Sequence, residues 1–146
     1  MSKMVKSDTS IAALSRAHQA LLRDLRKLGQ AIARGPGRSV EDLRARLTAA
    51  RAHLLDHFRF EEQNGYLDTV KKREPRLDRA IQHLVQEHRE LTGRLDALID
   101  EAAGASNVSE SMRQAVPQWL TRLASHEQRE NELVQDAFDF DIGAED

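Results

Sequence analysis

The stretch LLDHFRFEE, Leu54–Glu62, places a histidine and a glutamate where a helix that packs in a bundle carries apolar side chains. Just before it, apolar residues recur every three or four positions, the spacing of one face of an α-helix, at Leu47, Ala50 and Leu54. His57 and Glu61 continue that face. The stretch therefore predicts a long helix that turns an imidazole and a carboxylate towards the core.

The same helical spacing recurs along most of the 146 residues and predicts four helices, over residues 10–34, 39–65, 76–103 and 109–138. Short connections between long helices favour an all-α, up-down-up-down four-helix bundle, with residues 1–146 as a single domain. No alternating pattern predicts a strand.

Local signals set the expected helix ends. Gly35-Pro36-Gly37 ends the first helix and Gly104 the third, while Ser39 and Ser109 are suited to begin the second and fourth. Pro117 lies inside the fourth helix and predicts a kink or a late start there. The second helix should end near Gly65, residues 66–75 should form a short connector, and the acidic tail after Phe140 should be loose.

Composition excludes several classes of function. The 22 basic and 24 acidic residues give a formal net charge of −2, which does not favour binding to nucleic acid or to an anionic membrane surface. The absence of cysteine excludes disulfides, thiolate metal sites and thiol catalysis. Without a signal-peptide pattern or an apolar run of membrane-spanning length, we expect a cytoplasmic protein.

The second half of the chain repeats the first. When His18 is placed on His88, the leucines around the two histidines coincide, and with a shift of one residue the two His-x-x-x-Glu pairs coincide as well. Each half is thus a helical hairpin with one histidine on its first helix and a His-x-x-x-Glu pair on its second. The six repeated residues are His18, His57, Glu61, His88, His126 and Glu130.

A metal centre explains why these six residues share core positions. Residues four apart lie on one helix face about 5–6 Å apart, and an unpaired buried carboxylate costs several kcal/mol. Two divalent cations, with a bridging hydroxide or oxide, would compensate the charge, and imidazole with carboxylate suits iron, manganese or zinc. One such histidine alone would be typical of an ordinary hydrogen-bonded core residue, but the doubled pattern favours a dinuclear site.

Other polar and aromatic residues fall outside the repeat. His53 is expected at the surface edge of the helix face rather than as a support for a ligand, and His83 is expected in solvent. Glu62 and Glu87 are interpreted as surface charges, and Tyr66 as turn packing rather than a phenol at the site mouth. Two further aromatic side chains should pack in the bundle, Phe58 and Trp119.

The six residues, in order on four successive predicted helices, resemble the signature of hemerythrin-like proteins, also called HHE cation-binding domains. The resemblance covers about residues 10–138. It implies a centre of two non-haem irons joined by an oxo or hydroxo group. One iron would be bound by His18 and His57, the other by His88 and His126, and both would be bridged by Glu61 and Glu130.

The chain also departs from the family's oxygen carriers. These have a fifth histidine at His-x-x-x-His spacing on the third helix, where this chain has Leu84 and Thr92 four residues on either side of His88. They use a carboxylate five residues after the last histidine, whereas Glu130 follows His126 by four. The set is more similar to the di-iron proteins implicated in repairing iron–sulfur clusters after nitric oxide stress, whose cysteine-containing segment is absent here.

Three functions stay open at this point. The protein binds or senses O2, NO or iron itself; or it is a redox enzyme that reduces NO or breaks down peroxide, with a redox partner that the sequence does not identify; or a metal such as zinc only stabilises the bundle. The expected partner is a small diatomic or peroxide ligand, without nucleic acid or membrane.

Overall fold

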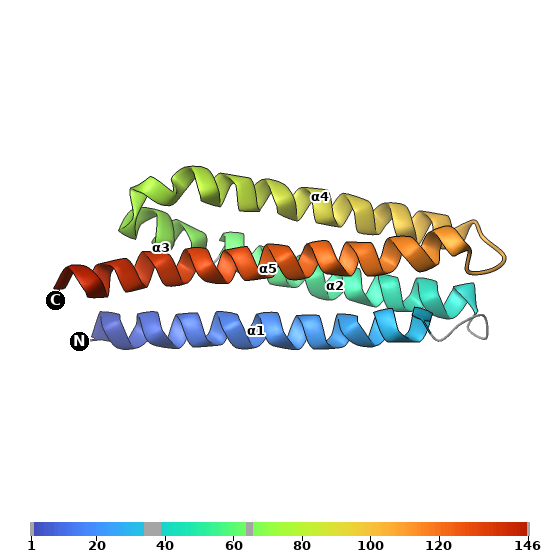
Figure 1. Cartoon of the computed structure of the whole chain (residues 1–146), viewed down its shortest axis with the longest axis horizontal. Helices are drawn as coiled ribbons and strands as arrows, with labels where there is room; N and C mark the ends of the chain where they lie inside the picture. Colours follow the sequence, from blue (N-terminus) through green and yellow to red (C-terminus); the bar gives the residue numbers. More distant parts are fainter. Residues whose placement is uncertain (1, 34–38, 64–65, 146) are drawn as a thin grey trace.

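The structure, a computed structural model, describes residues 2–33, 39–63 and 66–145. Its four long helices run alternately up and down, so the start of the first and the end of the last lie at the same end of the molecule (Figure 1). They are α1 (Ser2–Ala33), α2 (Val40–Gln63), α4 (Asp78–Ala103) and α5 (Glu110–Glu145). The predicted all-α, up-down-up-down bundle is confirmed.

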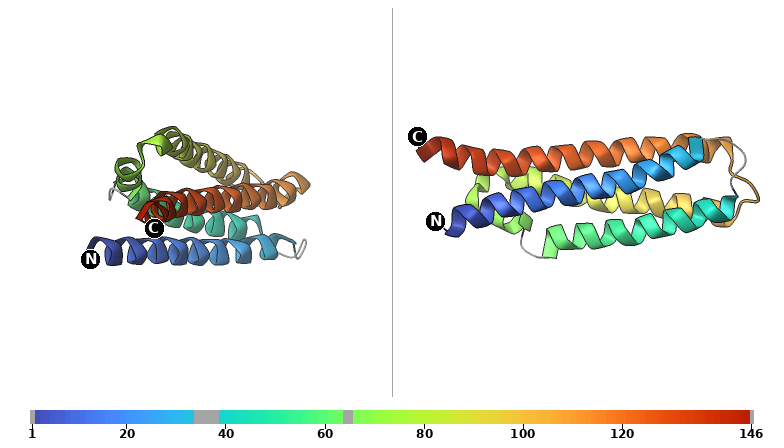
Figure 2. Two further views of the ribbon diagram at one scale, coloured as in Figure 1. Left: turned by 60° about the vertical axis from the view of Figure 1, so that its left-hand side comes forward. Right: turned by 90° about the horizontal axis from the view of Figure 1, so that it is seen from below.

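Each long helix packs beside two others, so the four surround a common core. α1 lies against α2 and α5, and α4 lies against the same two helices. The two further views in Figure 2 show α1 and α5 side by side along most of their length. Within the described residues, no helix is both long enough and apolar enough to cross a bilayer.

The helix ends follow the capping signals. Ser39 Oγ accepts a hydrogen bond from the backbone N–H of Asp42 (3.0 Å), and Ser109 Oγ accepts one from that of Met112 (3.1 Å). Both serines satisfy backbone donors that have no partner inside the first helical turn. Gly104 follows the last residue of α4, and its N–H donates to the carbonyl of Asp100 (3.2 Å).

The connector expected over residues 66–75 contains a helix of its own, α3 (Tyr66–Arg73), followed by a short 3₁₀ turn, η1 (Pro75–Leu77). Leu67 and Val70 on α3 are buried in a small cluster with residues of α4 and α5, which makes a helical segment of only eight residues stable. The prediction of a plain connector was therefore wrong.

α5 begins at Glu110, close to the predicted residue 109 and well before Pro117, so the alternative of a late start does not hold. Two other expectations about helix ends were wrong. α5 also continues to Glu145 through the tail expected to be loose, and α1 begins at Ser2 rather than near residue 10. Extending an existing helix adds one hydrogen bond for each residue that is fixed, so polar ends can remain helical.

Some expectations fall outside the described residues. These are the Gly35-Pro36-Gly37 stop, the end of the second helix at Gly65, and the side-chain packing of Tyr66.

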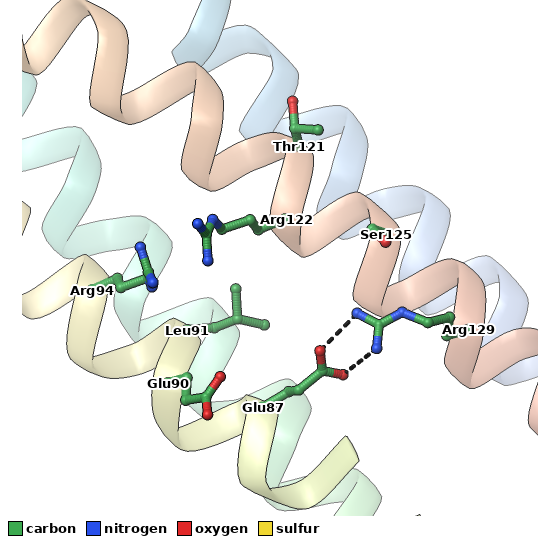
Figure 3. Close-up of a pocket in the computed structure, with 8 residues that line it drawn as sticks. All are labelled: Glu87, Glu90, Leu91, Arg94, Thr121, Arg122, Ser125 and Arg129. Atoms are coloured by element: carbon green, nitrogen blue, oxygen red, sulfur yellow. Dashed lines mark hydrogen bonds and ion pairs between the residues drawn. The ribbon is translucent and has the colours of Figure 1, made fainter. Parts of the chain in front are cut away.

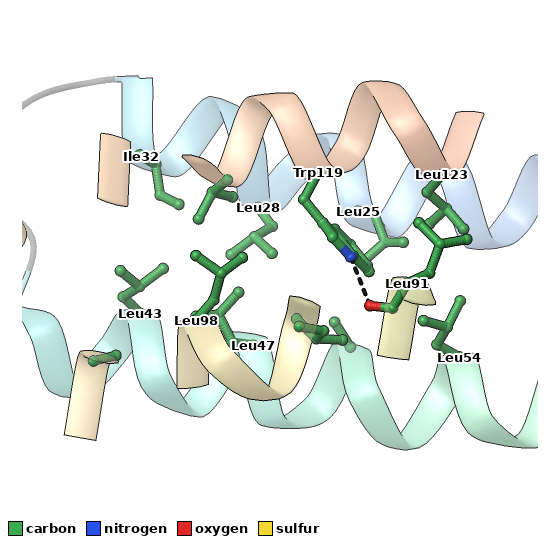
Figure 4. Packing of buried hydrophobic residues seen from close by; sticks show 14 of the residues in the cluster. Leu25, Leu28, Ile32, Leu43, Leu47, Leu54, Leu91, Leu98, Trp119 and Leu123 are labelled. Atoms are coloured by element: carbon green, nitrogen blue, oxygen red, sulfur yellow. Dashed lines mark hydrogen bonds between the residues drawn. The ribbon is translucent and has the colours of Figure 1, made fainter. Parts of the chain in front are cut away.

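The core consists of two apolar clusters with a polar layer between them. The larger cluster fills the bundle between Leu21 and Ile32 of α1 and the facing parts of the other long helices (Figure 4). In it, Trp119 is 2% exposed and its Nε1 donates to the carbonyl of Leu91 (2.9 Å). The smaller cluster joins α3, η1, the start of α4 and the end of α5. Along α4, His88 lies between Leu84 of the smaller cluster and Leu91 of the larger one.

Candidate metal centre

The polar layer contains all six residues of the repeated pattern. Each of them is buried, with exposed fractions between 0% and 8%. α1 and α4 contribute one histidine each, and α2 and α5 contribute a histidine and a glutamate each. The structure therefore brings together, in one small volume, His18, His57, Glu61, His88, His126 and Glu130.

The four histidines form two pairs of nearly identical geometry. The ring centroids of His18 and His57 are 4.8 Å apart with an interplanar angle of 70°. Those of His88 and His126 are also 4.8 Å apart, at 68°. The internal repeat of the sequence thus appears in space as two equivalent imidazole pairs on opposite sides of the layer.

The two glutamates lie between the histidine pairs. Glu61 directs Oε2 to His18 Nε2 (3.2 Å) and Oε1 to His88 Nε2 (3.6 Å). Glu130 directs Oε1 to His18 Nε2 (3.2 Å) and Oε2 to the Nε2 atoms of His88 (3.5 Å) and His126 (3.3 Å). Each carboxylate therefore faces both pairs, as a bridging ligand must.

A third buried carboxylate, Glu127, was missed by the sequence interpretation. It is 1% exposed, and its Oε2 lies 2.5 Å from His18 Nε2 and 3.5 Å from His57 Nε2. A signal was present, because Glu127 follows Leu123 by four residues and precedes Glu130 by three, the spacing of a core-facing stripe. The neighbouring His126 had already been assigned to that face.

Many polar atoms in this layer have no hydrogen-bond partner among the described residues. They include the Nε2 atoms of three histidines, both side-chain oxygens of Glu130 and Oε1 of Glu127. Buried nitrogen and oxygen atoms are nearly always hydrogen-bonded, so a group of orphans that converge on one place indicates a missing ligand. The Nε2 atoms belong to His57, His88 and His126.

The other ring nitrogens of three histidines are held by polar side chains of neighbouring helices. His18 Nδ1 donates to Asn131 Oδ1 (2.8 Å), and His88 Nδ1 donates to Glu62 Oε2 (2.7 Å). With its proton on Nδ1, the neutral form of each ring directs the Nε2 lone pair at the centre of the layer. Glu62 is exposed, as predicted for a surface charge, but its contact with His88 was missed because this partner lies on α4 rather than on its own helix.

Glu87 was also interpreted as a surface charge and also supports a histidine. Its Oε1 accepts from His126 Nδ1 (3.1 Å), and both its oxygens accept from the guanidinium of Arg129 (2.8 and 2.7 Å) in a groove between α4 and α5 (Figure 3). Partial burial raises the pKa of Glu87, but the hydrogen bonds from Arg129 and His126 outweigh this and lower it below its usual range. Glu87 is therefore an anionic acceptor that fixes the orientation of the His126 ring.

His18 and His88, one from each histidine pair, differ in the direction of their pKa shifts. Burial lowers the pKa of His18, but contacts with Glu127 and Glu130 outweigh it and raise the pKa to about 9. Burial raises the pKa of Glu127, and its contacts with His18 and His57 more than offset this and lower the pKa to about 2. Burial lowers the pKa of His88 to about 4, despite the opposing effect of Glu62. His88 is thus a neutral ligand at neutral pH, while a proton on His18 partly balances Glu127.

Comparison with known protein families identifies the family of this chain. The model of the hemerythrin HHE cation-binding domain matches residues 9–138. The chain belongs to the hemerythrin HHE family. No curated protein and no solved structure matches it in the corresponding comparisons.

The geometry of this HHE domain suits cations. Two ligand atoms about 2.1 Å from one ion, at an angle between about 90° and the tetrahedral angle, are about 3–3.5 Å from each other. Most contacts between Nε2 and carboxylate oxygen here are 3.2–3.6 Å long, too long for strong hydrogen bonds but suited to atoms that share an ion. Two groups of ligand atoms converge within 4.8 Å: one from His18, His57, Glu61, Glu127 and Glu130, and the other from His88, His126 and Glu130.

The remaining predictions for single residues hold. His53 is 46% exposed with its Nδ1 3.8 Å from Asp24 Oδ2, and His83 is exposed on α4. Phe58 and Trp119 are buried in the bundle as predicted. Phe58 also stacks on the ring of His88, which the sequence did not indicate (centroids 3.8 Å apart, 10° between planes).

Proposed function

We propose that this HHE domain holds two non-haem iron ions and binds or senses O2, NO or a related small oxidant at them. His18 and His57 would hold one ion, His88 and His126 the other, and Glu61 and Glu130 would bridge the two. When bound, the ions supply redox chemistry and coordination positions for a small ligand.

One observation carries the proposal: within the described part of the chain, imidazole nitrogens and carboxylate oxygens without hydrogen-bond partners converge at the centre of a buried layer. Three carboxylates contribute a charge of −3 and four neutral imidazoles contribute none, so two divalent cations would leave only +1. Without cations, three buried carboxylates at this separation would repel one another at a cost of several kcal/mol. Nitrogen and oxygen ligands together, with no thiolate, suit iron or manganese in open sites.

The residues around the ligands prepare the site for binding. Asn131, Glu62 and Glu87 each accept the Nδ1 proton of a histidine, so that the neutral form of each ring turns its Nε2 lone pair inward. His18, whose pKa is raised to about 9, has to give up its Nε2 proton when an ion binds. The apolar clusters on both sides keep bulk water away from the layer. The lowered effective dielectric constant strengthens the attraction between the carboxylates and a cation.

The test is the metal content and the ultraviolet–visible spectrum of protein purified without added metal. We expect about two irons per chain and near-ultraviolet charge-transfer bands that bleach on reduction and change when NO or azide is added. Zinc, or no metal in a stably folded protein, would overturn the redox function and leave a structural bundle. Sustained turnover of NO or peroxide with an added reductant would instead establish the alternative of a redox enzyme of oxidative or nitrosative stress.

A matched pair of variants tests the ligands. His57→Ala removes a buried proposed ligand, whereas His53→Ala removes an exposed histidine one helical turn earlier on α2. We expect His57→Ala to lose metal and stability together, and His53→Ala to retain both. Full metal content in His57→Ala would contradict the assigned site.

A further inference from the structure

The two sides of the polar layer differ at one pair of equivalent residues. In the internal repeat, Phe58 follows His57 on α2 and Glu127 follows His126 on α5. The two side chains occupy equivalent positions in space, each beside the histidine pair of the other half. One side of the layer thus has a carboxylate where the other has a phenyl ring.

On the first side, Glu127 adds an anionic ligand group. Its Oε2 lies 2.5 Å from His18 Nε2 and 3.5 Å from His57 Nε2, and its Oε1 has no hydrogen-bond partner among the described residues. A cation there, called the first position, has two imidazoles, Glu127 and the bridging glutamates within reach. These groups can supply five ligand atoms, which approaches saturation of a six-coordinate ion.

On the second side, Phe58 fills the equivalent space without offering a ligand. Its ring stacks on His88 and lies 5.8 Å from the ring of His126, at an angle of 72°. It is 4% exposed. A cation there, called the second position, has only two imidazoles and the bridging glutamates, so more of its coordination sphere stays free.

The second position also lies next to a surface pocket. This pocket of about 460 Å³ lies between α2 and α4, and its lining includes Phe58, Glu62, His88 and Gly93 but none of His18, His57 and Glu127. The pocket therefore reaches the rings of His88 and Phe58 on the second side of the layer, and these two buried side chains separate it from the centre.

We propose that Glu127 makes the two cation positions unequal. The first position binds its ion more tightly, and the second position is where the ion exchanges and where a small ligand binds. This inference rests on the proposed dinuclear centre and adds to it which ion is retained and which is available.

The experiment titrates chelator-treated protein with Co²⁺ in competition with a chromophoric chelator. Two binding steps are expected, but repulsion between the ions would also separate them, so variants decide. Glu127→Gln keeps the shape of the side chain and removes its charge. It should weaken the tighter binding step at least about tenfold. Loss of a residue that only supports a metal ligand already costs about 10–100-fold in affinity, and Glu127 is proposed to contact the ion directly. Glu132→Gln, an exposed change on the same helix, should alter neither step.

Phe58→Glu provides the reverse test, because it places a carboxylate at the second position. It should strengthen the weaker step and slow exchange of that ion, while circular dichroism checks that the bundle is folded. A Glu127→Gln variant that binds both ions as tightly as the unaltered protein would overturn the inference, even with two ions bound. If only one ion binds and Glu127→Gln weakens it, the dinuclear function fails while the role of Glu127 stands.

Discussion

The leucine-rich half of the bundle and its polar layer are lined by the same four helices, yet different forces hold them together. In the leucine-rich half, side chains such as Leu47, Leu95 and Leu123 are at most 1% exposed and gain free energy by leaving water, with no partner outside the chain. In the polar layer, the equivalent inward positions carry histidines and glutamates whose burial is unfavourable until a cation compensates them. One part of the core therefore stabilises the fold by itself, whereas the other part is suited to binding a ligand.

The largest change in the free energy of unfolding should come from a substitution in the leucine-rich half. Leu95→Ala removes a side chain that is fully buried in the larger cluster, and should lower the free energy of unfolding by about 2–5 kcal/mol. The loss should be similar with and without bound metal, because Leu95 lies outside the polar layer. Urea denaturation of both forms measures it, with the exposed change Arg94→Ala as control. A loss confined to the metal-bound form would contradict the separation of the two regions.

The polar layer should instead respond to pH in the metal-free protein. Since the pKa of His88 falls from 6.5 to about 4 on folding, its stabilising contribution is complete above pH 6.5 and is lost as the pH falls through 4. The loss is on the order of 3 kcal/mol. The lowered pKa of His126 acts in the same direction. The raised pKa of His18 has its effect between pH 6.5 and about 9, outside this window.

Chelator-treated protein should therefore unfold at lower urea concentrations at pH 4.5 than at pH 7. His88→Gln should flatten this dependence, and His83→Gln, which alters an exposed histidine of the same helix, should leave it unchanged. An unaltered profile in His88→Gln would mean that other groups cause the acid sensitivity.

The leucine-rich half and the six repeated ligands could be predicted from the sequence because each depends on one helix alone. A stripe at three- and four-residue spacing fixes which side faces inward, and a histidine within the stripe is therefore inward too. The internal repeat predicted that the histidines of both halves face one common site, because two halves with the same pattern direct their histidines in the same way.

The other features depend on neighbouring helices, which periodicity does not describe. Glu62 and Glu87 lie at the edges of their own helix faces, and only the position of the facing helix shows that each holds a histidine. Glu127 shares its stripe with Glu130, but the equivalent residue in the first half is an ordinary aromatic, so the repeat concealed it. The helix α3 is too short for its two buried residues, Leu67 and Val70, to show a period.

A smaller change should follow from loosening the support of one ligand. Glu87→Gln weakens the acceptor of the His126 Nδ1 proton and the ion pair with Arg129, and should reduce affinity for the second metal ion about 10–100-fold. Glu90→Gln alters an exposed residue of the same groove and should have no such effect. The Co²⁺ competition titration measures both. Equal affinities in the two variants would mean that His126 keeps its orientation without Glu87.

The smallest expected change in stability comes from a substitution in the pocket beside His88, and it tests whether this pocket is open space or closely packed. Gly93 lies inside α4, and a Cβ added there meets nothing within 4 Å. Gly93→Ala should therefore stabilise the protein by about 0.5–1 kcal/mol, because alanine loses less conformational entropy in a helix. Urea denaturation with metal bound measures the gain, and the metal content should not change.

Gly29→Ala on α1 is the matched control for this substitution. There an added Cβ would lie 2.8 Å from Leu120 Cδ1, so the leucine must move and the gain in helix stability should be reduced or lost. The contrast tests whether α4 faces open space beside the second cation position while α1 is closely packed against α5. If both substitutions stabilise the protein equally, the predicted difference between open space at Gly93 and close packing at Gly29 is contradicted. If Gly93→Ala lowers metal content, the pocket contributes to holding the ion as well as to reaching it.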